Sequence, residues 1–233
     1  MDRAARPAEP GADDALAAVA ALLGGATGSQ PRANWDTVVV ETEAGHRVGN
    51  PDAKVKLVEF FSYTCPHCAE FAQQGEGAIK LGYVIPGTIN VEYRHLIRDP
   101  VDLTVGMLVN CGAANKFTGN HEAFILGQAR WIGPLSRPTA AQRTRWTTAG
   151  AAGRRSIAGD FGFYPIMERR GYSRTEVDRC LADEATARRL AETSAKEWDR
   201  PGVDSTPTFA INGIVMPGTH TWAALERQLK EFL

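Results

Sequence analysis

The chain has 233 residues, a formal net charge of -1 and 43% hydrophobic residues. A chain of this size can bury a hydrophobic core of ordinary extent without disulfide or metal support. Acidic and basic residues are nearly balanced and mixed along the chain, so we exclude nucleic acid as a partner. Because no apolar run reaches the roughly 18 to 20 residues of a membrane-spanning helix, we do not expect an integral membrane protein.

The first part of the chain has the composition of a tether. Residues 1–35 are rich in Ala, Gly and Pro and show little periodicity. The apolar segment ALAAVAALL, residues 15–23, has two arginines before it and so has the outline of a secretory signal. Asp13 and Asp14, however, lie where the basic region of a signal should meet its apolar region. We therefore expect a flexible tail, or the remnant of an export segment, rather than an intact signal.

Four strands are predicted after the tether. Residues 37–42 are enriched in β-branched side chains, and the glycines that follow them indicate a turn and a loop. KVKLVEFFSY, residues 54–63, is typical of a buried strand, and NVEYRHLI, residues 90–97, predicts the next one. The fourth strand segment, TFAINGIVM, contains an Asn-Gly pair at 212–213, which is the strongest short signal for a hairpin turn. Apolar residues at helical spacing then predict a helix at the end of the chain.

The stretch between Ile97 and Thr206 has no strand signals and repeated helix signals, which predicts an all-helical insertion. Ser173 and Glu176 have the spacing of a capping box, and Asp183 can cap the following helix. The order of strand, CxxC, helix, strand, helical block, hairpin and helix predicts an α/β, thioredoxin-like fold with an inserted all-helical domain. We expect the first part of the thioredoxin-like domain at 36–99, the insertion at 100–200 and the second part at 201–233.

The stretch FFSYTCPHCAEF, residues 60–71, carries the chemistry. Its two cysteines, Cys65 and Cys68, could form a metal half-site, a structural disulfide or a redox centre. A structural zinc site needs four ligands, usually from a second CxxC or a paired His motif. The other two cysteines are isolated and the other histidines are scattered, so we expect no metal.

A redox role follows from the position of the pair. Cys65 follows a predicted buried strand and opens a helix, where unpaired N–H groups favour the thiolate over the thiol. Pro66 suits the first helical turn because it has no N–H, and the imidazole of His67 can add a positive or hydrogen-bonding partner to the Cys65 sulfur. Stabilising the reduced form makes the disulfide a stronger oxidant. We expect a substrate thiolate to attack Cys65, and Cys68, one turn deeper, to be the resolving cysteine.

A second feature lies at the entry to the last predicted strand, where Thr206-Pro207 stands. A proline is tolerated there because the first residue of a strand can lack its donor. Cis peptide bonds are almost confined to X-Pro, but the trans form is much commoner even in that case. From the residues alone we therefore expect a trans proline that starts a strand.

EFFSYTCPHCAEF together with TPTFAING, framed by strands and split by a helical block, resembles the DsbA family of bacterial thiol:disulfide oxidoreductases. The resemblance covers about residues 35–233. It implies that Cys65 is the exposed nucleophile, that Cys68 is its resolving partner, and that Pro66 and His67 are the dipeptide that tunes them.

The resemblance also implies roles for residues outside the CPHC motif. Thr206-Pro207 is expected to be a cis-proline loop that faces the active site, where an unfolded substrate docks in extended form. Glu59 matches the family's buried acidic residue. The resemblance implies that this residue relays protons to the resolving cysteine. An unpaired acid in a buried strand is costly, which favours a function; the alternative is that Glu59 lies on the wet face of its strand.

The threonine before the proline departs from the best-studied branch of the family. Disulfide isomerases of the same superfamily share it, which leaves the substrate preference and the redox poise open. The resemblance to those isomerases would imply a dimer that is built on a separate N-terminal dimerisation domain. Because the tether-like residues 1–35 cannot supply such a domain, we favour an oxidase.

Cys111 and Cys180 are a second departure. Both lie in predicted helices of the insertion, and an even number of cysteines in an exported protein favours a second disulfide. Some members of the family resemble this chain in having one. The alternative is two reduced cysteines that pack as small hydrophobic side chains.

We therefore expect a periplasmic protein disulfide oxidoreductase, a dithiol oxidase that introduces disulfides into unfolded or reduced exported proteins. The resemblance implies reoxidation by a membrane partner of the DsbB type, and we expect a monomer. No cofactor is needed because the cysteine pair carries the two electrons itself. A disulfide isomerase or reductase on the same fold is the first alternative. A non-redox binding or chaperone module, in which CPHC is a structural staple, is the second.

Overall fold

The computed structural model describes residues 34–233, so the predicted apolar segment and nearly all of the predicted tether lie outside the described residues. These residues contain a six-stranded sheet with the order β1-β2-β4-β3-β5-β6, in which β3 and β4 are parallel and the other neighbours are antiparallel. The strands are β1 (Val39–Glu41), β2 (His46–Gly49), β3 (Val55–Phe61), β4 (Ile89–His95), β5 (Thr208–Ile211) and β6 (Ile214–Val215).

Helical segments connect β3 to β4 and close the chain. A short 3-10 turn precedes the sheet, and an unbroken helical run that includes two π-helical stretches follows β3. Gly75, in this run, packs against Trp222 of the last helix: a Cβ on Gly75 would lie 3.2 Å from the Trp222 Cβ. The segments are η1 (Trp35–Thr37), α2 (Pro66–Phe71), η2 (Ala72–Glu76), α3 (Gly77–Ile79), η3 (Lys80–Val84) and α13 (Trp222–Phe232).

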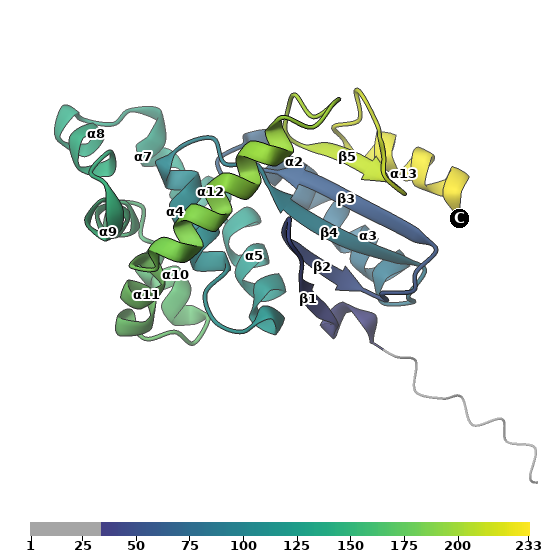
Figure 1. Cartoon of the computed structure of the whole chain (residues 1–233), viewed down its shortest axis with the longest axis horizontal. Helices are drawn as coiled ribbons and strands as arrows, with labels where there is room; N and C mark the ends of the chain where they lie inside the picture. The colour runs from purple at the N-terminus through teal and green to yellow at the C-terminus, as the bar shows by residue number, and fades with distance from the viewer. Residues whose placement is uncertain (1–33) are drawn as a thin grey trace, which may run out of the picture. The chain divides into compact units, whose positions relative to one another are not determined.

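A block of helices lies between β4 and β5 in the chain, beside the sheet (Figure 1). Its last helix, α12, is the longest and runs from the far side of the block back to the sheet. The segments are α4 (Pro100–Val109), η4 (Ala114–Lys116), α5 (Phe117–Ile125), α6 (Gln128–Trp131), α7 (Gly133–Ser136), α8 (Ala140–Trp146), α9 (Gly150–Asp160), α10 (Phe163–Arg169), α11 (Arg174–Leu181) and α12 (Glu184–Trp198).

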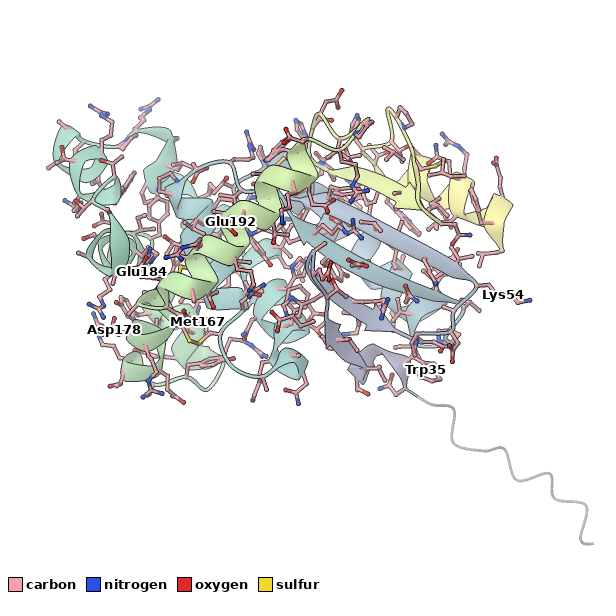
Figure 2. The ribbon with its side chains drawn as sticks, viewed as in Figure 1. Trp35, Lys54, Met167, Asp178, Glu184 and Glu192 are labelled. Atoms are coloured by element: carbon pink, nitrogen blue, oxygen red, sulfur yellow. A yellow bond between two sulfur atoms is a disulfide. The ribbon has the colours of Figure 1, made fainter. Side chains whose placement is uncertain are left out.

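The ends of these helices follow the capping signals of the sequence. Ser173 and Glu176 form the predicted capping box at the start of α11, and the Asp183 side chain accepts hydrogen bonds from two N–H groups in the first turn of α12. Glu184, which belongs to the same turn (Figure 2), pairs with Arg154 of α9. The long amphipathic helix is thereby tied to the middle of the block.

One continuous core joins the sheet to the helical block. Apolar side chains of β3 and β5, such as Leu57 and Phe209, belong to the same buried cluster as Phe124 and Met167 of the helices. Met167 lies inside the block in Figure 2. Because buried contacts run without a break from one part to the other, the block and the sheet should unfold together.

Two cysteines of the block are joined by a disulfide. Cys111, which follows α4, is bonded to Cys180 of α11, with 5.7 Å between their Cα atoms. The alternative of two reduced cysteines therefore does not apply to this structure.

The strand β2 is a correction to the sequence prediction, which placed a turn and a loop there. Gly45 precedes β2 because a Cβ at this position would lie only 1.9 Å from the carbonyl oxygen of Tyr93 in β4. Gly49 ends the strand with a φ of 117°, a conformation that L side chains rarely adopt. The glycines that resemble turn signals are thus required by the close approach of two strands. No helix within residues 34–233 has both the length and the apolarity to cross a membrane.

Candidate active site

The CPHC pair lies where the central strand β3 passes into helix α2. Cys65 is the N-cap residue of α2, with extended backbone angles, and Pro66 occupies the first turn. The N–H of Cys65 donates to the carbonyl of Ser62 at 3.3 Å and so closes a turn between strand and helix. This turn aims the Cys65 sulfur at the N-terminal end of α2, where backbone N–H groups lack helical partners.

Several hydrogen bonds stabilise the charged form of Cys65 and lower its pKa to about 5. The largest contribution is a hydrogen bond with the Cys68 side chain, and burial acts in the opposite direction. The side chain of Thr206 and the backbone N–H groups of Cys68 and His67 add to the lowering of the pKa. Cys65 is therefore mostly a thiolate at neutral pH, which is the reactive form of a cysteine.

Cys68 has the opposite character. Burial raises its pKa well above the usual value, and the hydrogen bond to Cys65 and the negative charges of Cys65 and Glu59 raise it further. The pair therefore consists of one thiolate and one thiol, and the thiol of Cys68 is the donor that holds the thiolate of Cys65.

The segment before β5 faces the pair. The Thr206-Pro207 peptide bond is cis. The Sγ atom of Cys65 lies 3.2 Å from the carbonyl oxygen of Thr206, so the protonated thiol can donate to it. On the other side of the loop, Nδ1 of His220 lies 2.7 Å from the Pro207 carbonyl oxygen, to which it can donate. His220 thus holds the loop through the Pro207 carbonyl, while the Thr206 carbonyl lies against the Cys65 sulfur.

Glu59 lies on the buried side of β3, not on a wet face, and its residue is only 2% exposed. Burial holds its pKa well above the usual range, and the charge of Glu76 raises it further. Burial therefore favours the neutral, protonated form of Glu59 over the carboxylate. When Glu59 is ionised, its negative charge raises the pKa of Cys68, so the two side chains lie close together in the core.

The sequence analysis missed a buried chain of polar side chains behind the pair. Nε2 of His121 lies 3.0 Å from Oε1 of Glu76, and Nδ1 of His121 lies 2.9 Å from the hydroxyl oxygen of Tyr63. Glu76 also lines a cavity of about 190 Å³ beside Lys80 and is part of the π-helical η2, a type of distortion that is often found at functional sites. The irregular helix marks the position of these side chains in the structure. The sequence analysis did not find it because π-helical stretches leave no pattern in the residues.

One expectation about exposure and one about a contact are wrong. Cys65 was expected to be exposed, but the residue is only 3% exposed because the loop at Thr206 covers its sulfur. The imidazole of His67 was expected to act on the Cys65 sulfur, but the His67 side chain is 76% exposed and lies 3.8 Å from Glu70. His67 does lower the pKa of Cys65, but it does so through its backbone N–H group.

Comparisons with known proteins identify the family and the fold of the chain. The family model described as thioredoxin matches residues 41–231. A crystal structure of a protein-disulfide isomerase from Novosphingobium aromaticivorans is 44% identical, covers 82% of this chain and 98% of its own, and superposes with a TM-score of 0.78. The crystal structure of alpha-DsbA1 from Wolbachia pipientis, at 20% identity, has the same fold: it covers 80% of this chain and 89% of its own, with a TM-score of 0.60.

Curated relatives of similar sequence carry related names. A protein of Rickettsia bellii named "Putative protein-disulfide oxidoreductase" is 27% identical over 168 residues, which are 72% of this chain and 56% of that protein. The chain thus spans little more than half the length of such relatives. The predicted thioredoxin-like fold with inserted helices is confirmed. The chain belongs to the thioredoxin family.

Proposed function

We propose that the chain is a dithiol oxidase that transfers the disulfide of Cys65 and Cys68 to reduced proteins. The observation that carries the proposal is the asymmetry of the pair: the pKa of Cys65 is lowered to about 5 while that of Cys68 is raised. A stabilised Cys65 thiolate favours the reduced form, and a pair with a stabilised reduced form is oxidising as a disulfide.

The reaction proceeds by two exchanges. A substrate thiolate attacks the Cys65 sulfur of the oxidised pair, forms a mixed disulfide and expels Cys68, whose high pKa makes it a poor leaving group unless it takes up a proton. Protonated Glu59 is the proposed donor of that proton. A second substrate thiolate then attacks the substrate sulfur of the mixed disulfide and releases Cys65 as a thiolate. The substrate loses two electrons, which the pair gains.

The substrate is proposed to bind as an extended segment along Thr206-Pro207. The cis-proline loop lies directly against the Cys65 sulfur, so a chain docked on the loop would bring its own sulfur into line with Cys65. The residues at the rim include His67 and Glu70, which line a small hollow with Thr221. Polar side chains would then lie beside the bound substrate segment.

The setting of the reaction is proposed to be outside the cytoplasm, in the periplasm. The disulfide between Cys111 and Cys180 supports an oxidising compartment. The clients are proposed to be unfolded or reduced exported proteins. A membrane partner of the DsbB type would reoxidise the pair, and the chain would act as a monomer.

The test is the equilibrium reduction potential of the pair in glutathione buffers, together with the transfer of its disulfide to a reduced, unfolded protein. The scale runs from about -120 mV for DsbA to about -270 mV for thioredoxin. A value toward the DsbA end, and transfer that is abolished in Cys65→Ser, is the expected result. A value at or below the thioredoxin end would exclude the oxidase and leave a reductase or a structural disulfide.

A disulfide isomerase is the second candidate. It is favoured by the 44% identical structure that is named as one, and by Thr206 before the proline. An isomerase rearranges wrong disulfides and needs Cys65 in its reduced form at the working potential. Recovery of activity from a scrambled protein by the reduced chain, without added oxidant, would favour this candidate over the oxidase.

A further inference from the structure

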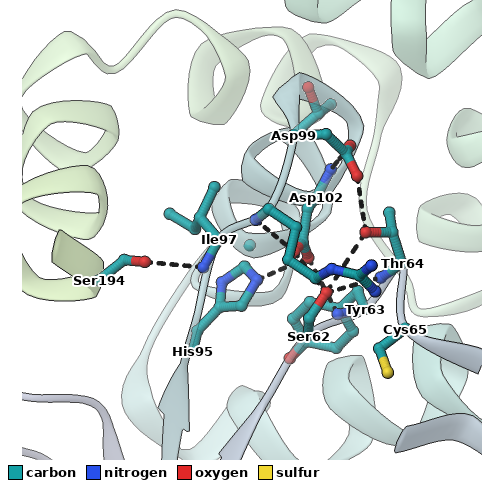
Figure 3. A network of polar contacts seen from close by, with 12 residues as sticks. Ser62, Tyr63, Thr64, Cys65, His95, Ile97, Asp99, Asp102 and Ser194 are labelled. Atoms are coloured by element: carbon teal, nitrogen blue, oxygen red, sulfur yellow. Dashed lines mark hydrogen bonds and ion pairs between the residues drawn. The ribbon is translucent and has the colours of Figure 1, made fainter. Parts of the chain in front are cut away.

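The segment Ser62–Cys65, which joins β3 to the active-site helix, is gripped by side chains of the helical block. Asp102, in the first turn of α4, is completely buried and accepts hydrogen bonds through both carboxylate oxygens (Figure 3). Its Oδ1 accepts from the N–H of Tyr63 at 2.9 Å, and its Oδ2 accepts from the hydroxyl of Ser62 at 2.6 Å. The carboxylate therefore fixes two consecutive residues of the segment.

The remaining hydrogen bonds of Asp102 hold the carboxylate itself in place. Nε2 of His95, at the end of β4, lies 2.6 Å from Oδ1, and the N–H of Arg98 donates to Oδ2 at 3.0 Å. Four donors thus surround one carboxylate in the interior. Buried carboxylates need such a set of partners, and a carboxylate with four of them has little freedom to move.

Asp99, the N-cap of α4, holds the next residue of the segment. Its Oδ2 accepts from the hydroxyl of Thr64 at 2.7 Å, while its Oδ1 accepts from the N–H of Asp102 at 2.9 Å. The capping interaction that starts α4 is therefore shared with the active-site segment (Figure 3).

Gln128, the first residue of α6, holds the segment from its carbonyl side. Its Nε2 donates to the carbonyl oxygen of Tyr63 at 2.7 Å and to that of Cys65 at 2.8 Å. The residue is only 4% exposed, so both of its amide hydrogens are used inside the protein. With Asp102 on its N–H and Gln128 on its carbonyl, both polar backbone groups of Tyr63 are bound by the helical block.

We propose that Asp99, Asp102 and Gln128 are positioning residues of the helical block that hold the segment Ser62–Cys65, and with it the Cys65 sulfur, against the start of α2. We refer to these three residues as the clamp. The inference rests on the proposed function in that Cys65 is the sulfur that substrates attack. It gives the helical block a part in the chemistry besides covering the site.

The clamp acts by geometry. The thiolate of Cys65 is stabilised by donors on Cys68, Thr206 and the backbone of α2, all of which require the sulfur at one position. Loosening the backbone of Cys65 lets the sulfur leave that position and lose hydrogen bonds that only the thiolate makes. The effect of a weakened clamp is therefore a rise in the pKa of Cys65 and a less oxidising pair.

Two variants test the clamp in the full chain. Gln128→Met removes the two donated hydrogen bonds without changing any charge. Asp102→Asn replaces one acceptor oxygen by a donor, and since each oxygen accepts from a backbone N–H, either orientation leaves the N–H of Tyr63 or Arg98 facing another donor. The measurement is the pKa of Cys65, followed by the ultraviolet absorbance of its thiolate, with the glutathione equilibrium of the pair as a second reading.

The block offers a matched control for each variant. Asn120 is a fully buried amide that donates to the carbonyls of Val109 and Cys111 and to the hydroxyl of Tyr172, so Asn120→Leu removes buried amide hydrogen bonds away from the segment. Asp160→Asn changes a carboxylate that accepts from Arg145 and Trp146 of α8. Both controls weaken the block without contacting Ser62–Cys65.

The expected result is that Gln128→Met and Asp102→Asn each raise the pKa of Cys65 by about one unit, which is about a tenfold loss in thiolate stability. Such a loss makes the pair less oxidising by about 30 mV. Asn120→Leu and Asp160→Asn should lower the melting temperature and leave this pKa unchanged. The sign matters for Asp102→Asn, because removing a negative charge without loosening the segment would lower the pKa of Cys65.

The proposal is overturned if the clamp variants leave the pKa of Cys65 unchanged or lower it, or if the controls raise it equally. If Gln128→Met does not fold, Thr64→Val takes its place, because it removes only the hydroxyl that Asp99 binds and keeps the volume. The wild-type chain separates this outcome from the proposed function. If the wild type transfers no disulfide, the oxidase is excluded, whereas the effect of the clamp on the pKa is still measured.

Discussion

The sulfur of Cys65 lies 3.2 Å from the carbonyl oxygen of Thr206, although 141 positions separate the two residues in the chain. Strand β5, which follows Thr206, pairs with β3, which precedes Cys65, and this pairing brings the two together. The surroundings of the reactive sulfur are thus formed by residues that precede the helical block in the sequence and by residues that follow it.

The first prediction concerns the Thr206 side chain. Thr206→Val keeps the shape of the residue and removes the hydroxyl that helps to lower the pKa of Cys65. A hydrogen bond to a charged group contributes about 1.5–3 kcal/mol, so we expect this pKa to rise by at least about one unit. Titration of the thiolate absorbance checks the shift. Thr104→Val, which removes a buried hydroxyl bonded to Pro100 in α4, should leave the pKa of Cys65 where it is.

The second prediction separates the two possible replacements of Cys68. The hydrogen bond from Cys68 contributes most to lowering the pKa of Cys65 to about 5. Cys68→Ala removes the donor, whereas Cys68→Ser keeps a hydroxyl that can donate. The rate of alkylation of Cys65, measured against pH, should have its midpoint shifted upward more in the alanine variant than in the serine variant. Equal midpoints in the two variants would show that the donor on residue 68 is unimportant.

The third prediction concerns the stability of the reduced protein and the acid Glu59. Its folded pKa is raised above the usual 4.5, chiefly by burial. A raised pKa stabilises the folded state below about pH 4.5, and that stability is lost as the pH rises toward the folded pKa, because the unfolded chain releases its proton first. Glu59→Gln removes this loss. The variant should gain on the wild type by up to about 1.4 kcal/mol for each pH unit across that window.

Denaturant unfolding of the reduced forms at a series of pH values measures this difference. Glu231→Gln replaces an exposed acid near the end of α13 and should shift the stability by no more than about 0.5 kcal/mol at any pH. A difference between Glu59→Gln and the wild type that stays constant with pH would contradict a raised pKa. Slower transfer of the disulfide by Glu59→Gln is expected in addition, because the amide of glutamine has no acidic proton to transfer to Cys68.

The fourth prediction concerns the disulfide between Cys111 and Cys180, which closes a loop with a sequence separation of 69. Replacing both cysteines by alanine should lower the free energy of unfolding by about 4 kcal/mol in the chain-entropy model. The glutathione equilibrium of the CPHC pair should not change, because the second bridge exchanges no electrons with it. A shift of that equilibrium in the double variant would show that the two disulfides are coupled.

Local patterns in the sequence were sufficient for the parts of the fold that depend on neighbouring residues. The buried run before Cys65 predicts β3, and Pro66 predicts the start of α2, because strand burial and helix initiation act within a few positions. The Asn212-Gly213 pair predicts the turn between β5 and β6, and both residues adopt positive φ angles there. The same locality made the capping box of α11 predictable.

Contacts between distant segments could not be predicted in this way. The residues of the clamp cannot be told apart from other polar residues in the sequence. Asp102 has the position of an acid in the first turn of a helix, and only the fold shows that it contacts the segment after β3. The exposed imidazole of His67 shows the reverse: proximity in sequence to Cys65 did not mean contact with its sulfur. Long-range packing decides both cases.

The position of the helical block between β4 and β5 also sets the order in which the site comes into being. A chain made from its N-terminus presents Cys65 and Cys68 to the surroundings long before Thr206 and β5 have been synthesised. The pairing of β3 with β5 is among the most distant in the sheet, and distant pairings form slowly. A newborn chain therefore carries a Cys65 whose thiolate lacks the part of its stabilisation that Thr206 provides. The contribution of Thr206 to the low pKa of Cys65 is acquired only when β5 has paired with β3, so the thiolate reaches its full stability in the last step of forming the sheet.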